Sequence, residues 1–451
     1  MDPSSGGKYS LTEGGILRKL LFIAVPIMGT QFLQMAYNFT DMFWLGRVGS
    51  DAVAASGAAG MYMWLSFGFI LIGRMGAEIG VAQSLGRGDK QAARSFSQNA
   101  LIIALVLGLV FGLALILFKR ELAAFFGFRE PHIAEDTAVY LSIVGFSIPV
   151  TFVSAVVVGT YNAAGNSRTP FFLNALGLAA NVVLDPLLIL GLGMGVRGAA
   201  IATVISQIIA GVLMIVAITF FRDRPFDRYF FRLRLDKKKI LLILKWAIPI
   251  GLESILFCFL SMVTSRIEAS FGADVMAAGK VGSQIESLSW LIGGGFGSAL
   301  VAFIGQNYGA GKAERIRRGV RISMVVMALW GVLVSLFLFF AGGFVFSLFL
   351  PGPESLKLGV AYLRILAFCQ LPMNLEAVGA GAFKGTGRTI PPSLASIISH
   401  IIKPILAFIL SKTSLGLYGI WVAVSATAIL RGVWICLWYG LSEFISPRKT
   451  G

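Results

Sequence analysis

The feature that most restricts the fold of this chain is a series of long apolar runs, which recur along all 451 residues. Each run supplies the roughly 20 residues that a helix needs to cross a bilayer. Charged residues make up only 13% of the chain, about half the share in a soluble protein. We predict an all-α multi-pass membrane protein with twelve transmembrane helices, at about residues 16–46, 52–86, 91–118, 133–163, 170–193, 196–221, 240–271, 275–309, 315–341, 356–386, 389–411 and 415–444.

Basic residues are distributed unevenly over the loops between these helices. If the chain starts inside the cell, the outer loops hold only Arg47, Lys119, Arg120, Arg129, Arg197, Lys357 and Lys412, and the other loop Lys and Arg residues face the cytoplasm. The positive-inside rule then places both termini in the cytoplasm. The first residues lack the features of a cleaved signal peptide, so we expect the first span to be retained. This topology accounts for the net charge of +16, so we expect contact with membrane lipid and no nucleic-acid partner.

The chain contains two similar halves. A shift of 223 residues aligns residues 25–27 (VPI) with residues 248–250 (IPI), and it aligns residues 83–88 (QSLGRG) with residues 306–311 (QNYGAG). With one or two small gaps, Gly165 then meets Gly387. The sequence therefore indicates a duplicated unit of six helices.

The basic stretch at residues 222–239 is the natural boundary between these halves. We predict an N-terminal lobe at residues 1–221, a basic cytoplasmic linker at residues 222–239, and a C-terminal lobe at residues 240–451. An even number of spans in each lobe makes the repeat parallel, with a pseudo-two-fold axis along the membrane normal. Two such lobes can rock against each other, which is the usual basis of alternating access.

Asp41 and Asp185 interrupt apolar runs of the N-terminal half, where an ionisable group is expensive and is a functional candidate by default. Helical spacing places polar residues on one stripe of each of three spans. These stripes are Gln34, Tyr37, Asn38 and Asp41 on the first span, Asn174, Asn181 and Asp185 on the fifth, and Thr203 and Gln207 on the sixth. At about 1.5 Å of rise per residue, both acids fall in the outer half of the lobe, so they could meet.

Two buried carboxylates that meet require either a proton or a cation. Sodium is a hard ion, and Asp41, Asn181, Asp185 and Thr203 could supply its oxygen ligands. We expect Gln34, Tyr37, Asn38, Asn162, Asn174 and Gln207 to form a supporting polar network. The alternative is a structural hydrogen-bond cluster between helices.

The second half lacks this pair of acids. At the 223-residue shift, Thr264 takes the place of Asp41 and Phe408 takes the place of Asp185, so we expect ion chemistry in one lobe only.

The C-terminal half has its own acids, Glu253, Glu286 and Glu376, which are candidates for a substrate or coupling role. The alternative for Glu253 and Glu376 is an internal ion pair with Lys280, Arg364 or Lys403. In the first span, Pro26 removes a backbone hydrogen bond, and we predict that it is a hinge that lets the helix bend when Asp41 is protonated or bound.

The sequence contains no signature of an enzyme. Residues 305–313 (GQNYGAGKA) have one residue too many for a Walker A loop and end in Ala, and no HExxH or GxSxG motif is present. Three cysteines without metal or disulfide spacing lie in apolar spans. We therefore expect no catalytic residue, no organic cofactor and no metal beyond a possible sodium ion.

Four segments carry a resemblance that covers about residues 17–441. They are residues 41–46 (DMFWLG), 83–88 (QSLGRG), 181–200 (NVVLDPLLILGLGMGVRGAA) and 305–312 (GQNYGAGK). With the duplication and twelve spans, they resemble the multidrug and toxic compound extrusion (MATE) family, in its prokaryotic DinF-like branch. The resemblance implies an efflux antiporter in the cell membrane that exchanges organic substrates for protons or sodium ions.

The resemblance also implies a cation site in the N-terminal lobe at Asp41, Asn181, Asp185 and Thr203. Some branches carry coupling acids in the C-terminal lobe, but the positions in this chain are displaced from theirs. Abundant aromatic and methionine residues suit small cationic or amphipathic organic substrates. We expect a monomer. The alternative function is a lipid-linked oligosaccharide flippase of the related superfamily, which a groove of basic residues or extra spans would favour.

Overall fold

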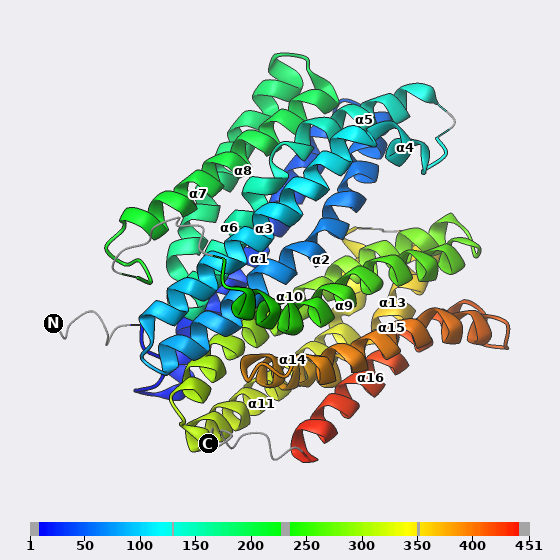
Figure 1. Cartoon of the computed structure of the whole chain (residues 1–451). Helices are drawn as coiled ribbons and strands as arrows, with labels where there is room; N and C mark the ends of the chain where they lie inside the picture. The colour runs from blue at the N-terminus through cyan, green and yellow to red at the C-terminus, as the bar shows by residue number, and fades with distance from the viewer. Residues whose placement is uncertain (1–8, 129, 227–234, 350–351, 442–451) are drawn as a thin grey trace. The chain divides into compact units, whose positions relative to one another are not determined.

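The structure is a computed structural model that describes residues 9–128, 130–226, 235–349 and 352–441, and these residues form helices and no β-strand (Figure 1). The first half contains α1 (Ile16–Leu45), α2 (Ser50–Gly86), α3 (Lys90–Leu117), α4 (Lys119–Ala124), α5 (Pro131–Gly145), α6 (Ile148–Ala163), α7 (Arg168–Pro186), the π-helical turn η1 (Leu187–Gly191) and α8 (Gly195–Phe220). The second half contains α9 (Lys237–Ala269), α10 (Ala273–Gly309), α11 (Ala313–Leu336), the π-helical turn η2 (Phe337–Ala341), α12 (Gly342–Ser347), α13 (Pro353–Ala367), α14 (Gln370–Gly385), α15 (Ile390–Ser411) and α16 (Leu417–Leu441).

Ten helical segments among the described residues are long and apolar enough to cross a membrane, and twelve are if each of two bent helix pairs counts as one span. The bent pairs are α5 with α6, at 50°, and α13 with α14, at 46°. Each bend comes just before a proline, Pro149 or Pro372, which cannot donate the backbone hydrogen bond that would continue the preceding helix. These spans confirm the predicted all-α fold with twelve membrane helices.

The duplication is visible in the helix boundaries. The starts of α13, α14, α15 and α16 each lie 222 residues after the starts of α5, α6, α7 and α8, whereas α10 and α11 start 223 residues after α2 and α3. One residue is therefore missing between the third and fourth spans of the second half. The counterpart of Asp185 is consequently Ala407, which is buried, and the predicted counterpart Phe408 is wrong by one position.

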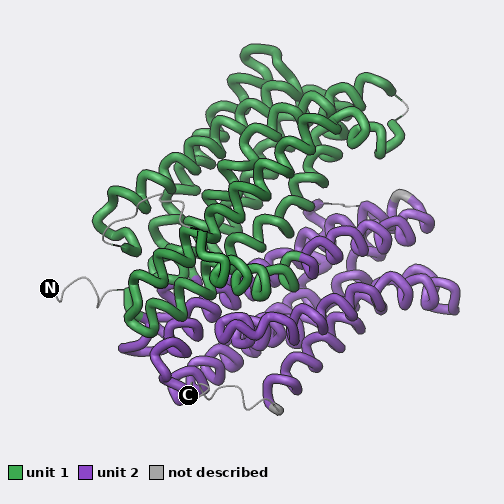
Figure 2. Tube along the Cα trace, viewed as in Figure 1, with its two compact units in different colours: residues 1–10, 25–251 green, residues 11–24, 252–451 purple. Residues whose placement is uncertain are grey.

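The described chain divides into two compact units (Figure 2). Unit 1 comprises residues 1–10 and 25–251, and unit 2 comprises residues 11–24 and 252–451. These boundaries differ from the predicted lobes, because they fall inside α1 and α9, close to Pro26 and Pro249, rather than at the basic linker. Residues 227–234 of the predicted linker lie outside the described residues.

The segment before α1 is fastened to unit 2 through its backbone. Leu11 is fully buried, and its N–H donates to Gln306 Oε1 at 3.0 Å. Its carbonyl oxygen accepts from Asn307 Nδ2 at 3.2 Å and from Arg315 Nε at 3.3 Å. Gln306 and Asn307 of the GQNYGAGK segment therefore bind the backbone of Leu11. The similarity of this segment to a phosphate-binding loop is limited to its sequence.

The segment before α9 is held in the same way by unit 1. The N–H of Asp236 donates to Asn99 Oδ1 of α3 at 3.0 Å. The Asp236 carboxylate caps α9, since its Oδ1 accepts from the backbone N–H of Lys239 at 3.2 Å and of Lys238 at 3.1 Å. These bonds hold the pKa of the Asp236 carboxyl below its ordinary value. The segment that leads into each half of the chain is thus hydrogen-bonded to helices of the other half.

Small residues allow close helix crossings inside unit 2. A Cβ added to Gly381 of α14 would lie 2.7 Å from the carbonyl oxygen of Gly297 of α10, and one added to Gly297 would lie 2.9 Å from the carbonyl oxygen of Ala377. Membrane helices associate through such contacts, because lipid provides no hydrophobic force between them. The α10–α14 crossing therefore depends on glycine.

Candidate functional site

Three helices of unit 1 bring the predicted residues together. Asp41 lies one turn before the end of α1, Asn181 and Asp185 lie in the last turns of α7, and Thr203 lies in the third turn of α8. Because α1 and α7 end at the same end of unit 1 at which α8 begins, their polar stripes meet at one depth. The sequence stripes therefore predicted the faces of these three helices correctly.

The Asn181 amide bridges the two acids. Its Nδ2 donates to Asp41 Oδ1 at 3.3 Å and to Asp185 Oδ1 at 3.1 Å. The hydroxyl of Thr203 donates to Asp41 Oδ2 at 3.4 Å. The two carboxyl groups accept from the same amide nitrogen and are close enough for the charge of one to act on the other. We refer to Asp41, Asn181, Asp185 and Thr203 as the acid cluster.

The acid cluster has more oxygen acceptors than donors. Asn181 and Asp185 are fully buried, and Thr203 is 7% exposed. Asn181 Oδ1 and Asp185 Oδ2 are buried and have no hydrogen-bond partner among the described residues. A buried oxygen without a donor carries a desolvation cost, and two neighbouring carboxylates repel each other. A shared proton or a hard cation would relieve both costs, so the cluster is chemically suited to hold either one.

Two tyrosines complete the surroundings of the cluster. Tyr140 of α5 is 7% exposed and belongs to the electrostatic surroundings of Thr203 and Asp41. The hydroxyl of Tyr37 is buried and has no hydrogen-bond partner among the described residues. Sequence reasoning missed Tyr140, because a tyrosine in an apolar helix is usually a packing residue. The signal was available in the duplication, since Tyr362 occupies the equivalent position of α13.

The remaining residues of the predicted polar network do not join the cluster through hydrogen bonds among the described residues. Gln207 Oε1 accepts from Ser147 at 2.7 Å, and therefore ties α8 to the start of α6. Asn174 Nδ2 donates to the carbonyl of Pro170 on its own helix at 2.9 Å.

Three further predicted network residues lie apart from the cluster. Asn162 occupies the last turn of α6, next to the start of α7. Asp185 lies at the far end of α7, about 26 Å from the start of α7 by helical rise. Gln34 and Asn38 are exposed. The stripe argument gives the face of a helix correctly but does not fix which residues on that face touch a neighbour.

The acids of unit 2 form separate contacts. Glu376 pairs with Arg431 of α16, whose Nε lies 2.7 Å from Glu376 Oε2, and Arg431 Nη1 donates to His400 Nε2 at 3.4 Å. The internal ion pair considered for Glu376 therefore exists, but its partner is none of the three predicted bases, Lys280, Arg364 and Lys403.

The other two acids of unit 2 accept from neutral side chains. Glu253 Oε2 accepts from the Ser393 hydroxyl at 2.9 Å, and Glu286 Oε1 accepts from Gln370 Nε2 at 3.1 Å. Neither carboxylate forms an ion pair with a described residue. The three acids thus have three different partners, Arg431, Ser393 and Gln370.

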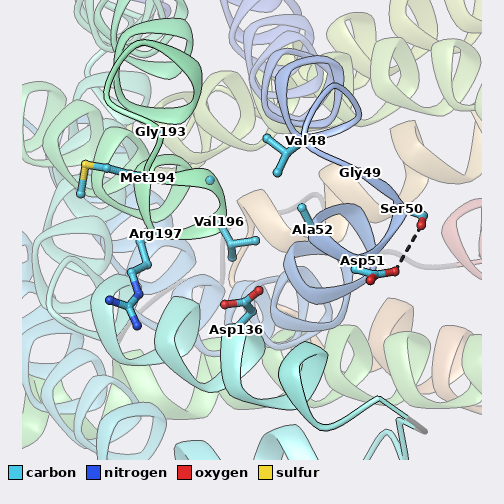
Figure 3. Close-up of a pocket in the computed structure, with 11 residues that line it drawn as sticks. Val48, Gly49, Ser50, Asp51, Ala52, Asp136, Gly193, Met194, Val196 and Arg197 are labelled. Atoms are coloured by element: carbon cyan, nitrogen blue, oxygen red, sulfur yellow. Dashed lines mark hydrogen bonds between the residues drawn. The ribbon is translucent and has the colours of Figure 1, made fainter.

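A cavity of about 330 Å³ lies near the end of unit 1 at which the acid cluster is found (Figure 3). The α1–α2 turn, α5 and the segment that leads into α8 supply its lining, which includes Asp51, Asp136 and Arg197. Asp51 is also paired with His132, whose Nε2 lies 2.8 Å from Asp51 Oδ2. None of the four cluster residues lines this cavity, so it is a separate hollow.

The predicted hinge lies inside an unbroken helix. α1 continues through Pro26, and the hydroxyl of Thr30 donates to the Pro26 carbonyl oxygen at 3.0 Å. Pro26 also lies next to the boundary between the two units within α1. Its role as a hinge stays a prediction.

Known proteins resemble this chain over nearly its whole length. The family model described as MatE matches residues 26–187 and 249–409, which together exceed half of the chain. A "Probable multidrug resistance protein NorM" of Thermotoga maritima is 29% identical over 437 residues, which cover 92% of this chain and 90% of that protein. A "Probable multidrug resistance protein YoeA" of Bacillus subtilis is 25% identical over 449 residues, covering 97% and 96%.

Solved structures share the fold. One described as "Outward-facing conformation of a multidrug resistance MATE family transporter of the MOP superfamily" matches with a TM-score of 0.90, covers 98% of both chains and is 20% identical. The two blocks of the family match begin at Pro26 and Pro249, which are equivalent residues of the two halves. The comparison therefore agrees with the duplication found in the sequence.

Proposed function

Because the chain belongs to the multidrug and toxic compound extrusion (MATE) family of membrane transporters, we propose that it is an efflux antiporter whose coupling ion binds at the acid cluster. The antiporter would exchange small organic substrates, cationic or amphipathic, for a proton or a sodium ion. It would act as a monomer in the cell membrane, with both termini in the cytoplasm. No organic cofactor is needed for this reaction.

The observation that carries the proposal is the excess of buried acceptor oxygens in the acid cluster. Asn181 Oδ1 and Asp185 Oδ2 lack donors among the described residues, and the two carboxyl groups accept from one and the same amide nitrogen. A purely structural cluster would be expected to satisfy its buried acceptors. An ion site needs such acceptors to be free when the ion is absent.

Coupling requires that the ion bind the two transport states with different affinity. Asp41 belongs to α1, whereas Asn181 and Asp185 belong to α7, so ion binding at the cluster ties two helices together. A bend of α1 at Pro26 would change the distance between Asp41 and α7. The ion would therefore favour the state in which the two helices are close, and the substrate would favour the other.

The test is uptake of a cationic dye into proteoliposomes under separately imposed sodium and pH gradients. The purified full chain would be compared with Asp41→Asn and Asp185→Asn, which keep the side-chain size and remove one charge. We expect each variant to lose ion-driven uptake by about tenfold or more, the effect of one lost charged ligand. Asp51→Asn is the matched control, because Asp51 is an exposed acid of the same unit.

The two gradients identify the coupling ion, since only the gradient of that ion drives uptake. Ion-driven flux that persists undiminished in both Asp41→Asn and Asp185→Asn would overturn the proposal. Equal loss in Asp51→Asn would also contradict it, because a general effect of acid removal would then explain the result.

A further inference from the structure

Lys403 places a side-chain amine in the middle of α15, a helix long and apolar enough to cross the membrane. Its Nζ donates to the Ser261 hydroxyl of α9 at 3.0 Å and lies 5.2 Å from the centre of the Phe257 ring. It forms no ion pair with a described residue. A charge at this depth without a counterion is expensive, and is retained where it serves a function.

The neighbouring charges in unit 2 do not neutralise Lys403. Arg431 is occupied by Glu376 at 2.7 Å and adds to the positive charge of the region. Glu286 acts on Lys403 only at a longer distance, and its carboxylate accepts from Gln370. The ammonium therefore keeps hydrogen-bonding capacity beyond the one bond to Ser261, since it carries three N–H donors.

The duplication places Lys403 at the counterpart of the acid cluster. At the 222-residue offset of α15 and α16, Lys403 corresponds to Asn181 and Ser425 corresponds to Thr203, while Thr264 of α9 corresponds to Asp41. In unit 1, Asn181 reaches from α7 to α1, and in unit 2, Lys403 reaches from α15 to α9. Unit 1 thus presents carboxylates that require a cation, whereas unit 2 carries a basic side chain at the equivalent place.

An aromatic surface lies directly beside this ammonium. Phe257 is 39% exposed, and the centre of its ring lies 5.0 Å from that of the His400 ring. A planar ligand can therefore stack on Phe257 while an anionic group on the ligand receives hydrogen bonds from Lys403.

We propose that unit 2 contains a substrate site that binds aromatic compounds through a carboxylate held by Lys403, with the aromatic ring on Phe257. This inference rests on the proposed transport function for its physiological meaning and names a substrate class for it. The site differs from the acid cluster in its helices and in the sign of its charge. Unit 1 would then hold the coupling ion, and unit 2 would hold the acidic end of the substrate.

The test is equilibrium binding of two dyes to the purified full chain in detergent, measured by fluorescence polarisation without any ion gradient. Rhodamine B carries a free carboxylate, and its methyl ester has the same ring system without that charge. We expect the wild type to bind rhodamine B about tenfold more tightly than the ester, the effect of one charge-assisted hydrogen bond. Lys403→Gln should reduce this ratio to about one, and Lys403→Arg should keep most of it.

Lys412→Gln is the matched control, because Lys412 lies just beyond the end of the same helix and over another phenylalanine ring, Phe408. It should leave the ratio of the two affinities unchanged. Phe257→Leu should weaken both dyes by about the same factor, since both lose the ring contact.

A wild-type chain that does not discriminate between the two dyes would overturn the proposal, and so would a Lys403→Gln chain that keeps the wild-type ratio. The first of these outcomes needs no variant, so the test holds even if Lys403→Gln fails to fold. Failure of this proposal can be distinguished from failure of the ion-coupling proposal. Asp41→Asn should lose gradient-driven uptake but keep the wild-type ratio of the two dye affinities in equilibrium binding.

Discussion

Asn181→Ala tests the acid cluster at its centre, because this amide joins both carboxyl groups. The substitution removes the donor to Asp41 at 3.3 Å and to Asp185 at 3.1 Å, and it removes the unpartnered Oδ1. Hydrogen bonds to charged groups contribute about 1.5–3 kcal/mol each, and these two are long, so we take a total of about 1.5–3 kcal/mol. This energy corresponds to roughly tenfold to 150-fold in an equilibrium constant.

The direction of the effect depends on which ion is coupled. If the ion is sodium, loss of the Oδ1 ligand weakens the site, and the sodium concentration for half-maximal dye uptake should rise by at least about tenfold. If the ion is a proton, loss of two N–H donors disfavours the charged carboxylates, and half-maximal uptake should move to higher pH by about one unit or more. Proteoliposome uptake measured over a sodium series and over a pH series distinguishes the two.

Asn174→Ala is the control for this measurement. Asn174 lies on the same stripe of α7, two turns earlier, but its amide donates to the Pro170 carbonyl and to no other acceptor among the described residues. Its removal should leave both ion dependences unchanged. The reasoning would be refuted if Asn181→Ala left the sodium and pH dependences unaltered, or if Asn174→Ala shifted them equally.

Three further predictions concern the hinge, the Glu376–Arg431 ion pair and the helix packing. Pro26→Ala should slow dye uptake and the exchange between transport states measured by spin-label distances, and unchanged values would exclude a hinge at Pro26. Arg431→Met should destabilise the protein by about 3–5 kcal/mol in thermal unfolding, because it leaves the largely buried Glu376 carboxylate, 13% exposed, without its partner, and the additional change Glu376→Gln should restore most of the loss. Gly381→Ala should cost about 1–3 kcal/mol by the same assay, whereas Gly294→Ala, where a Cβ meets nothing within 4 Å, should be neutral or slightly stabilising, and equal effects would contradict the packing argument.

The sequence predicted the helices and the meeting of the two acids for definite physical reasons. Twelve apolar runs are strongly periodic signals, and the polar stripes fixed the faces of α1, α7 and α8. The common end of these helices followed from counting membrane crossings. Asp41, Asn181, Asp185 and Thr203 therefore came together as expected, although their role as an ion site stays a prediction.

Other contacts could not be predicted from a single chain. Glu376 pairs with Arg431, 55 positions away, and the choice among several bases depends on how α14 and α16 are rotated, which spacing does not reveal. The place of Asn162, by contrast, was predictable, because counting membrane crossings puts the end of α6 beside the start of α7, at the end of that helix opposite Asp185. The one-residue deletion that makes Ala407 the counterpart of Asp185 lies in a connection where the two halves have little similarity.

The segment before α1 binds helices of the second half, and the segment before α9 binds a helix of the first half, so the two halves of the chain depend on each other. Leu11 is docked on residues that are synthesised about 300 positions later, and residues 237–251 complete a unit whose other helices are made first. A chain cut within the basic linker would yield two fragments, each lacking a helical segment that the other carries. We therefore expect neither fragment to fold completely by itself. Co-expression of both fragments should supply each unit with its missing segment. The two halves, which arose by duplication, have thus come to depend on each other for folding.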